Sequence, residues 1–130
     1  MAEKRVDSVM QTEFPSLRLH TPIREAVALF VDTGWAAMPV VDDKGALVGI
    51  MSQKDCFRSA LNASYYRQWS GTVEEHYSRE VDTLNVETDF VTAAEAFIDK
   101  PFRAYPVTRH GLLVGMLNRE DLLKAFLAFG

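Results

Sequence analysis

The sequence predicts an α+β fold in which one β-α-β-β-α unit occurs twice. Three observations indicate this: the chain repeats itself, apolar residues recur at helical spacing in each copy, and a strand–turn–strand pattern follows each of those helices. Ala37-x-Pro39-Val40 returns 67 positions later as Ala104-x-Pro106-Val107. Leu47-Val48-Gly49 returns 66 positions later as Leu113-Val114-Gly115, after a turn that is one residue shorter in the second copy. We expect two small sheets, each with helices on one face, packed as one pseudo-twofold domain.

Each copy begins with an extended segment and an amphipathic helix. The extended segments are residues 16–19 and 83–86. Thr21 or Thr88 follows and can cap a helix, and Pro22 suits a first helical position. Gly34 and Pro101 are expected to end these helices. The apolar positions at helical spacing are Ile23, Ala26, Val27 and Phe30 in the first copy, and Phe90, Ala93, Ala94 and Phe97 in the second.

A hairpin and a second helix complete each copy. The predicted first strands are residues 38–41 and 105–108, followed by polar turns with a late glycine, Gly45 or Gly111, as a hairpin bulge requires. The closing helices are expected at about 53–61 and 119–129. The predicted organisation is therefore a first repeat over 1–61, an ordered connector over 62–72, and a second repeat over 73–130.

Composition excludes several classes of function. The chain has 130 residues with 14 basic and 18 acidic side chains, a net charge of −4, which argues against nucleic acid or an anionic membrane as partner. No apolar run has the roughly 20 residues of a membrane span, and no apolar stretch of a secretion signal follows the N-terminus. The single cysteine, Cys56, is expected to be a packed thiol in a reducing cytoplasm.

The residues contain no catalytic or metal-binding constellation. His20, His76 and His110 have no cysteine or acidic partners at metal-ligand spacing, and Ser52 has no evident histidine and aspartate to activate it. We therefore expect no enzyme activity, no metal site and no required cofactor.

Two motifs in register resemble a known family. Each copy has small-apolar-Pro-Val before its hairpin and Gly-apolar-x-[Ser/Asn]-x-x-Asp after it, and together they resemble a tandem pair of CBS domains, a Bateman module, over roughly residues 6–127. The resemblance implies a regulatory module that binds an adenine nucleotide (AMP, ADP or ATP) or a related nucleoside such as S-adenosylmethionine in two clefts between the repeats.

The resemblance also implies the residues that bind the ligand. The aspartate of each second motif would hold the ribose hydroxyls, and the serine would lie near a phosphate. One cleft would join Ser52 and Asp55 to Arg79, Asp82, Arg103 and Ala104. The other would join Asn118 and Asp121 to Thr12, Pro15, Ala36 and Ala37.

Each of these assignments has a structural alternative. Ser52-x-x-Asp55 is also a helix capping box, and Asn118-x-x-Asp121 is a variant of one, so capping alone would explain both acids. Arg103 suits a phosphate but equally a solvated loop. Its counterpart is Ala36, which favours adenosine without several phosphates, or no ligand, in that cleft. Asp82 would repel a phosphate unless it faced the base. Trp35, Phe102 and Tyr105 can wall a base, although packing is their commoner role.

Two functions from different classes follow. The first is a ligand sensor that signals to an unknown protein partner in trans; the second is a non-catalytic dimerisation or assembly module with empty clefts. Both readings allow a homodimer, and the apolar surplus of the last helix supports association. The residues behind that surplus are Leu122, Leu123, Phe126, Leu127 and Phe129.

Overall fold

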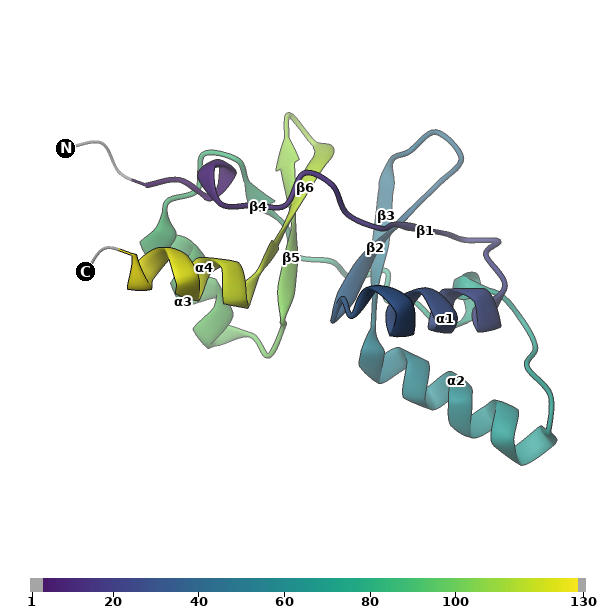
Figure 1. Cartoon of the computed structure of the whole chain (residues 1–130). Coiled ribbons are helices and arrows are strands. Elements are labelled where there is room, and N and C mark those ends of the chain that lie inside the picture. The colour runs from purple at the N-terminus through teal and green to yellow at the C-terminus, as the bar shows by residue number, and fades with distance from the viewer. Residues whose placement is uncertain (1–3, 129–130) are drawn as a thin grey trace. The chain divides into compact units, whose positions relative to one another are not determined.

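The computed structural model describes residues 4–128, which divide into two compact units (Figure 1). The continuous unit is Pro15–Val81. The split unit joins the described residues up to Phe14 to those from Asp82 onward. The continuous unit thus lies, in sequence, inside the split one.

The continuous unit has the predicted β-α-β-β-α order. Its three-stranded sheet has the order β1-β2-β3, with β1 parallel to β2 and β2 antiparallel to β3. Figure 1 shows α1 and α2 together on one side of this sheet. Its elements are β1 (Leu17–Arg18), α1 (Ile23–Thr33), β2 (Ala37–Val41), β3 (Leu47–Ser52), α2 (Gln53–Tyr66) and the short 3-10 helix η2 (Val73–Glu75).

The split unit repeats the same topology. Its sheet has the order β4-β5-β6, again with one parallel and one antiparallel pair. Its elements are the 3-10 helix η1 (Val6–Ser8), β4 (Leu84–Asn85), α3 (Phe90–Asp99), β5 (Ala104–Arg109), β6 (Leu112–Asn118) and α4 (Arg119–Leu127). The α+β fold class and the doubled unit are therefore confirmed.

The predicted threonine caps were wrong. The residue at the N-cap of α1 is Pro22, and that of α3 is Asp89, whose carboxylate accepts from Thr92 N at 2.7 Å. The hydroxyls of Thr21 and Thr88 instead accept from backbone N–H groups three residues earlier, at 3.1 and 3.2 Å. Each threonine therefore stabilises the turn before its helix.

The helix α2 is longer than the sequence predicted. It continues through Tyr66 and ends at Arg67, which adopts a left-handed φ of 55°. The first residues of the predicted connector are therefore its last turn, in which Ala63 is buried. The other helix ends agree more closely: Gly34 caps α1 with φ 73°, and Pro101 follows the cap of α3. Phe129 lies outside the described residues.

Both hairpins have the predicted glycine turn. Gly45 and Gly111 adopt φ of 82° and 78°, a region open to residues without a side chain. The strand register shifts by a bulge between Val40 and Val41, and between Val107 and Thr108.

A leading segment completes each sheet; we use this name for residues 5–12 and 72–79. Gln11 exchanges two backbone hydrogen bonds with Met116 of β6, at 2.8 and 2.9 Å, and Ser78 exchanges two with Ile50 of β3, at 2.9 and 2.8 Å. Gly49 and Gly115 make this approach possible: a Cβ on Gly115 would lie 3.0 Å from Gln11 O, and one on Gly49 would overlap Ser78 O. The glycines in the motif thus allow the close approach of the protein's own leading segments.

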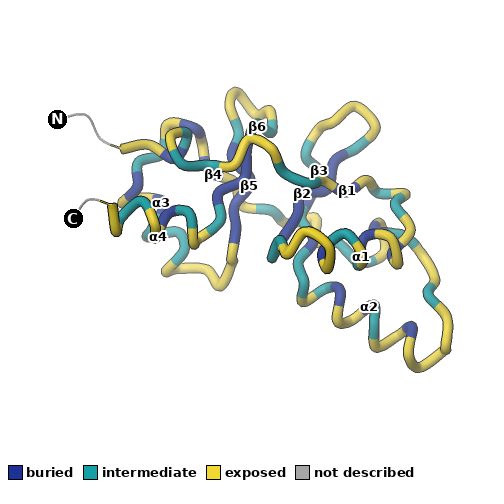
Figure 2. Tube along the Cα trace, in the orientation of Figure 1, coloured by how far each residue is buried: buried dark blue, intermediate teal, exposed yellow. Residues whose placement is uncertain are grey.

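Each unit has its own apolar core, and each leading segment contributes a valine to it. Figure 2 shows the buried residues following β2 and β5, the middle strands. Val6 packs in the core of the split unit with Phe90, Leu117 and Leu122, and Val73 packs in the continuous unit with Ile23. Both valines are fully buried.

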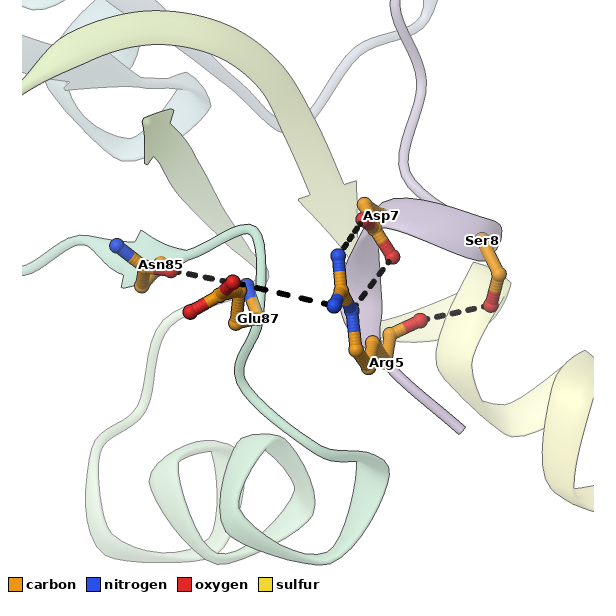
Figure 3. Close-up of polar contacts among 5 residues, drawn as sticks. All are labelled: Arg5, Asp7, Ser8, Asn85 and Glu87. Atoms are coloured by element: carbon orange, nitrogen blue, oxygen red, sulfur yellow. Dashed lines mark hydrogen bonds and ion pairs between the residues drawn. The ribbon is translucent and has the colours of Figure 1, made fainter. Parts of the chain in front are cut away.

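Polar contacts at its start hold the first leading segment in place (Figure 3). The guanidinium of Arg5 pairs with the Asp7 carboxylate at 2.5 Å and with Glu87 at 3.9 Å. This pairing lowers the pKa of Asp7 below its usual value. Backbone bonds from Val6 N to Thr88 O and from Phe90 N to Lys4 O continue the attachment.

Candidate functional site

The first candidate acid, Asp55, lies in a complete capping box at the start of α2. Its Oδ2 accepts from Ser52 N at 2.9 Å and from Ser52 Oγ at 3.2 Å, and Ser52 Oγ accepts from Asp55 N at 3.4 Å. Both residues are half-buried. The capping alternative is therefore present here, and Asp55 accepts these bonds through one of its two oxygens.

The start of β2 lies directly beside this capping box. Ala37 pairs with Ser52 across the hairpin, and Gln53 N donates to Ala36 O at 3.0 Å. The side-chain amide of Gln53 donates to Trp35 O, also at 3.0 Å. The continuous unit thus brings Ala36 and Ala37 together with Ser52 and Asp55.

The second candidate acid, Asp121, has different partners. Gln11 Nε2 lies 3.3 Å from Asp121 Oδ1 and 3.4 Å from Oδ2, so one amide group contacts both carboxylate oxygens. Among the described residues, the side chain of Asn118 makes no capping bond, although Asn118 occupies the N-cap position of α4. The capping variant predicted for Asn118 and Asp121 is therefore not formed.

Arg103 and Ala104 lie beside this second acid's helix. Ala104 is buried and pairs with Asn118, and Arg119 N donates to Arg103 O at 2.9 Å. The Arg103 side chain is exposed. The split unit thus repeats the arrangement of the other, with an arginine where the continuous unit has Ala36.

The remaining predicted residues lie on the segments that connect the units. Thr12 follows Gln11 and belongs to the split unit with Asn118 and Asp121; Arg79 follows Ser78 and belongs to the continuous unit with Asp55. Both are exposed. Pro15 is half-buried. Asp82 forms an exposed ion pair with Lys100 at 3.5 Å, so its charge has a partner.

The predicted clefts join residues of different units. The pairing of Ser52 and Asp55 with Asp82, Arg103 and Ala104 crosses from the continuous to the split unit. The pairing of Asn118 and Asp121 with Pro15, Ala36 and Ala37 crosses in the other direction. These cross-unit pairings stay predictions.

The aromatic residues near these loops pack within their units. Tyr105 is buried, donates its hydroxyl to Ala96 O at 2.8 Å, and has its pKa raised by burial. Phe102 lies edge-on to Tyr105, with ring centroids 5.7 Å apart, and is 38% exposed. Trp35 packs against the core of the continuous unit. Packing is thus the observed role of Trp35 and Tyr105, and Phe102 keeps an exposed edge.

An apolar groove lies between α1 and α2. Its volume is about 270 Å³, and Cys56 contributes to its wall. Cys56 is a buried free thiol, as predicted, and burial raises its pKa to about 11. The other lining residues are Val27, Phe30, Val31, Gln53, Phe57 and Ala60.

Residues 4–128 hold neither a metal-binding cluster nor a membrane-spanning helix. Within this range no group of three or more histidine, cysteine, aspartate or glutamate side chains is arranged to hold a metal ion. None of the helices in the same range is long and apolar enough to cross a membrane.

Sequence reasoning missed Gln11. The repeat pairs it with Ser78, a different residue, so it left no trace among the identities between the copies. One feature of the sequence could have identified Gln11 as a candidate. It is a long polar side chain next to the predicted site residue Thr12, on a segment that both copies contain.

Comparison with protein families decides the classification. The CBS domain model matches residues 6–62 and again residues 73–128. The chain belongs to the CBS domain family. Both matches carry the helix-start acid described above, Asp55 in the first CBS domain and Asp121 in the second.

Curated relatives share sequence with this CBS pair. The protein YtoI of Bacillus subtilis, which is uncharacterised, is 33% identical over 95 residues, 72% of this chain. The alignment covers 20% of YtoI, and two other uncharacterised relatives, from Methanocaldococcus jannaschii and Acidianus ambivalens, are covered over 41% and 73% of their lengths.

Solved structures share the fold of the CBS pair. CBSX2, a CBS-pair protein of Arabidopsis thaliana, is matched in a structure described as a complex with AMP, with TM-score 0.85, 24% identity and coverage of 97% of this chain and 98% of the other. The CBS pair of protein MJ0100, described in complex with 5-methylthioadenosine and S-adenosyl-L-methionine, matches with TM-score 0.77 and 23% identity over 99% of this chain and 100% of the other.

Proposed function

We propose that this CBS pair is a regulatory module that binds an adenine nucleotide or a related nucleoside and signals the binding to a protein partner. The observation that carries the proposal is the doubled arrangement at the helix starts. In both units a half-buried aspartate stands three residues after the end of the hairpin, and a buried alanine lies across from the hairpin's last residue. CBSX2 with AMP and MJ0100 with two adenosine compounds support the ligand class.

The chemistry of these groups suits a nucleoside. A carboxylate can accept hydrogen bonds from both hydroxyls of a ribose. A small alanine beside it leaves room for a flat base, and the start of a helix favours a negatively charged group. Arg103 and Arg79 are exposed arginines that can reach a phosphate. We therefore propose AMP, ADP, ATP and S-adenosylmethionine as the candidate ligands, with the twelve predicted residues as their site.

Signalling needs a ligand that prefers one arrangement of the module over another. We propose that the module acts in trans on a protein partner, as a homodimer. Its one cysteine is a buried free thiol, which fits the reducing cytoplasm that we propose as its location.

The test is a thermal-shift screen followed by calorimetry with AMP, ADP, ATP and S-adenosylmethionine. A ligand at about 100 times its Kd should stabilise the fold by roughly 2.7 kcal/mol, which raises the Tm measurably. We expect Asp55→Asn to weaken binding at that site by tenfold or more, because the amide loses the charge and one acceptor. Asparagine keeps an oxygen that can accept from Ser52 N, so the capping contribution is largely retained.

The matched control is Asp32→Asn, an exposed aspartate of α1 that the site does not include. It should bind as the wild type does. If no adenine ligand raises the Tm, or if both asparagine variants bind equally well, the sensor proposal fails.

A second candidate function rests on the apolar groove between α1 and α2. In its wall Val31 and Phe57 are each more than 70% exposed, an apolar surface that a partner helix would cover. This favours an assembly module with empty ligand sites. Sedimentation that shows a dimer, broken by Phe57→Glu, together with a flat ligand screen, would favour assembly over sensing.

A further inference from the structure

The two equivalent aspartates, Asp55 and Asp121, differ in the hydrogen-bond partners of their carboxylate oxygens. Within residues 4–128, the hydrogen bonds to the Asp55 side chain fall on Oδ2, which leaves Oδ1 for a ligand. Both oxygens of Asp121 face Gln11 Nε2, at 3.3 and 3.4 Å. A ribose diol approaches a carboxylate in this same two-oxygen manner, so the amide takes the position that the diol would need.

The backbone fixes Gln11 in this place. Its two hydrogen bonds with Met116, at 2.8 and 2.9 Å, set the register of the leading segment on β6. Gly115, which has no side chain, lets the segment come this close. The amide therefore needs only its own side-chain rotamer to meet Asp121.

The other unit has the same backbone and a different side chain. Ser78 is the counterpart of Gln11 and makes the same pair of backbone bonds, with Ile50. Its hydroxyl is short and donates to Glu80 O at 3.1 Å, away from Asp55. The asymmetry between the two acids thus comes from one residue of the leading segment.

We propose that Gln11 is a specificity-determining residue that makes the two nucleoside sites unequal. Its amide competes with the ribose for Asp121, so the Asp55 site binds the nucleoside more tightly and fills first. The Gln11 side-chain amide both orients the Asp121 carboxylate and contacts its two oxygens. This inference rests on the function proposed above, and it adds an order of filling to it.

The experiment isolates each site and exchanges the two residues. In an Asp55→Asn background, which leaves the Asp121 site, Gln11→Ser should tighten AMP binding about 3- to 10-fold, the worth of one modest hydrogen bond. In an Asp121→Asn background, Ser78→Gln should weaken AMP binding by a similar factor. Calorimetry gives the affinities, and the Tm of each ligand-free variant confirms that it is folded.

The outcomes separate this inference from the proposed function. Unchanged or weaker binding after Gln11→Ser, in a protein that binds AMP, overturns the role of Gln11 alone. Binding that appears only after Gln11→Ser supports it. Failure of the wild type and of every variant to bind AMP, ADP, ATP or S-adenosylmethionine overturns the nucleoside site, and the role of Gln11 with it.

Discussion

Cys56 shows how strongly the fold changes the chemistry of a single residue. The thiol is 8% exposed and faces the groove between α1 and α2. Burial disfavours the thiolate, with the nearby Asp55 charge as a second cause, and together they raise the pKa to about 11. Since the thiolate is the reactive form, Cys56 should be nearly inert at neutral pH.

We expect alkylation of native Cys56 by iodoacetamide at pH 8 to be at least 100-fold slower than in the urea-unfolded chain. The folded pKa is raised, so the stabilisation from the neutral thiol is complete below the unfolded pKa of about 8.5 and is lost as the pH rises toward 11. Cys56→Ala should remove the part of the fall in unfolding free energy that comes from Cys56 ionisation. Urea denaturation at several pH values between 8 and 11 measures this. Equal alkylation rates in native and unfolded protein would contradict this.

Residue-level prediction succeeded where a motif carried its own geometry. The capping box of Ser52 and Asp55 was readable because both partners lie within one helical turn. The hydrogen bond between Gln11 and Asp121 could not be predicted, since it joins residues 110 positions apart that only the folded sheet brings together.

At the scale of elements, the leading segments depend on two glycines. Gly49 and Gly115 are equivalent, but their surroundings differ: a Cβ at Gly49 meets Ser78 O and the Tyr77 ring, whereas at Gly115 the nearest atom is the thioether of Met10. A methionine side chain can move aside, and a backbone carbonyl cannot without losing its register.

We therefore expect Gly49→Ala to cost about 2–3 kcal/mol of unfolding free energy and Gly115→Ala about 1 kcal/mol, the upper and lower ends of overpacking costs. Urea denaturation of both variants against wild type measures the difference. A larger cost at Gly115 than at Gly49 would contradict the expected order of the two costs.

The order and type of the elements were predictable because each copy supported the other. Their ends were less so. Thr21 and Thr88 looked like helix caps, yet their hydroxyls close the preceding turns, and α2 continues past the expected end to Tyr66. The first miss is a choice between two local hydrogen bonds that threonine can make. The second reflects packing, since the added turn of α2 buries Ala63.

At the scale of the whole molecule, the sequence repeats and the compact units do not coincide. The repeats divide near the middle of the chain, whereas the split unit takes its leading segment from the far end of the sequence. The fold class was predictable from the repeat together with the helical spacing and the strand–turn–strand pattern in each copy. The exchange of leading segments was not predictable, because it depends on contacts between residues far apart in the sequence, such as Gln11 with Met116.

Deletion of residues 1–14 should therefore destabilise the split unit selectively. It removes the fully buried Val6, worth roughly 1.5–3 kcal/mol, and the backbone bonds to Met116 and Thr88. Hydrogen exchange should show lost protection in β5, β6 and α4. Amides of 15–81 serve as the internal control and should keep theirs; uniform loss across both units would count against the division.

The division of the chain into a continuous and a split unit also affects the order in which the units can fold during synthesis. A ribosome completes the continuous unit once Val81 has emerged, so that unit can fold early. The first leading segment is synthesised before that unit, yet its own sheet is synthesised after it. At about 5–20 residues per second, it waits several more seconds for β6 to arrive. For that interval Val6 lacks the core that buries it in the finished fold.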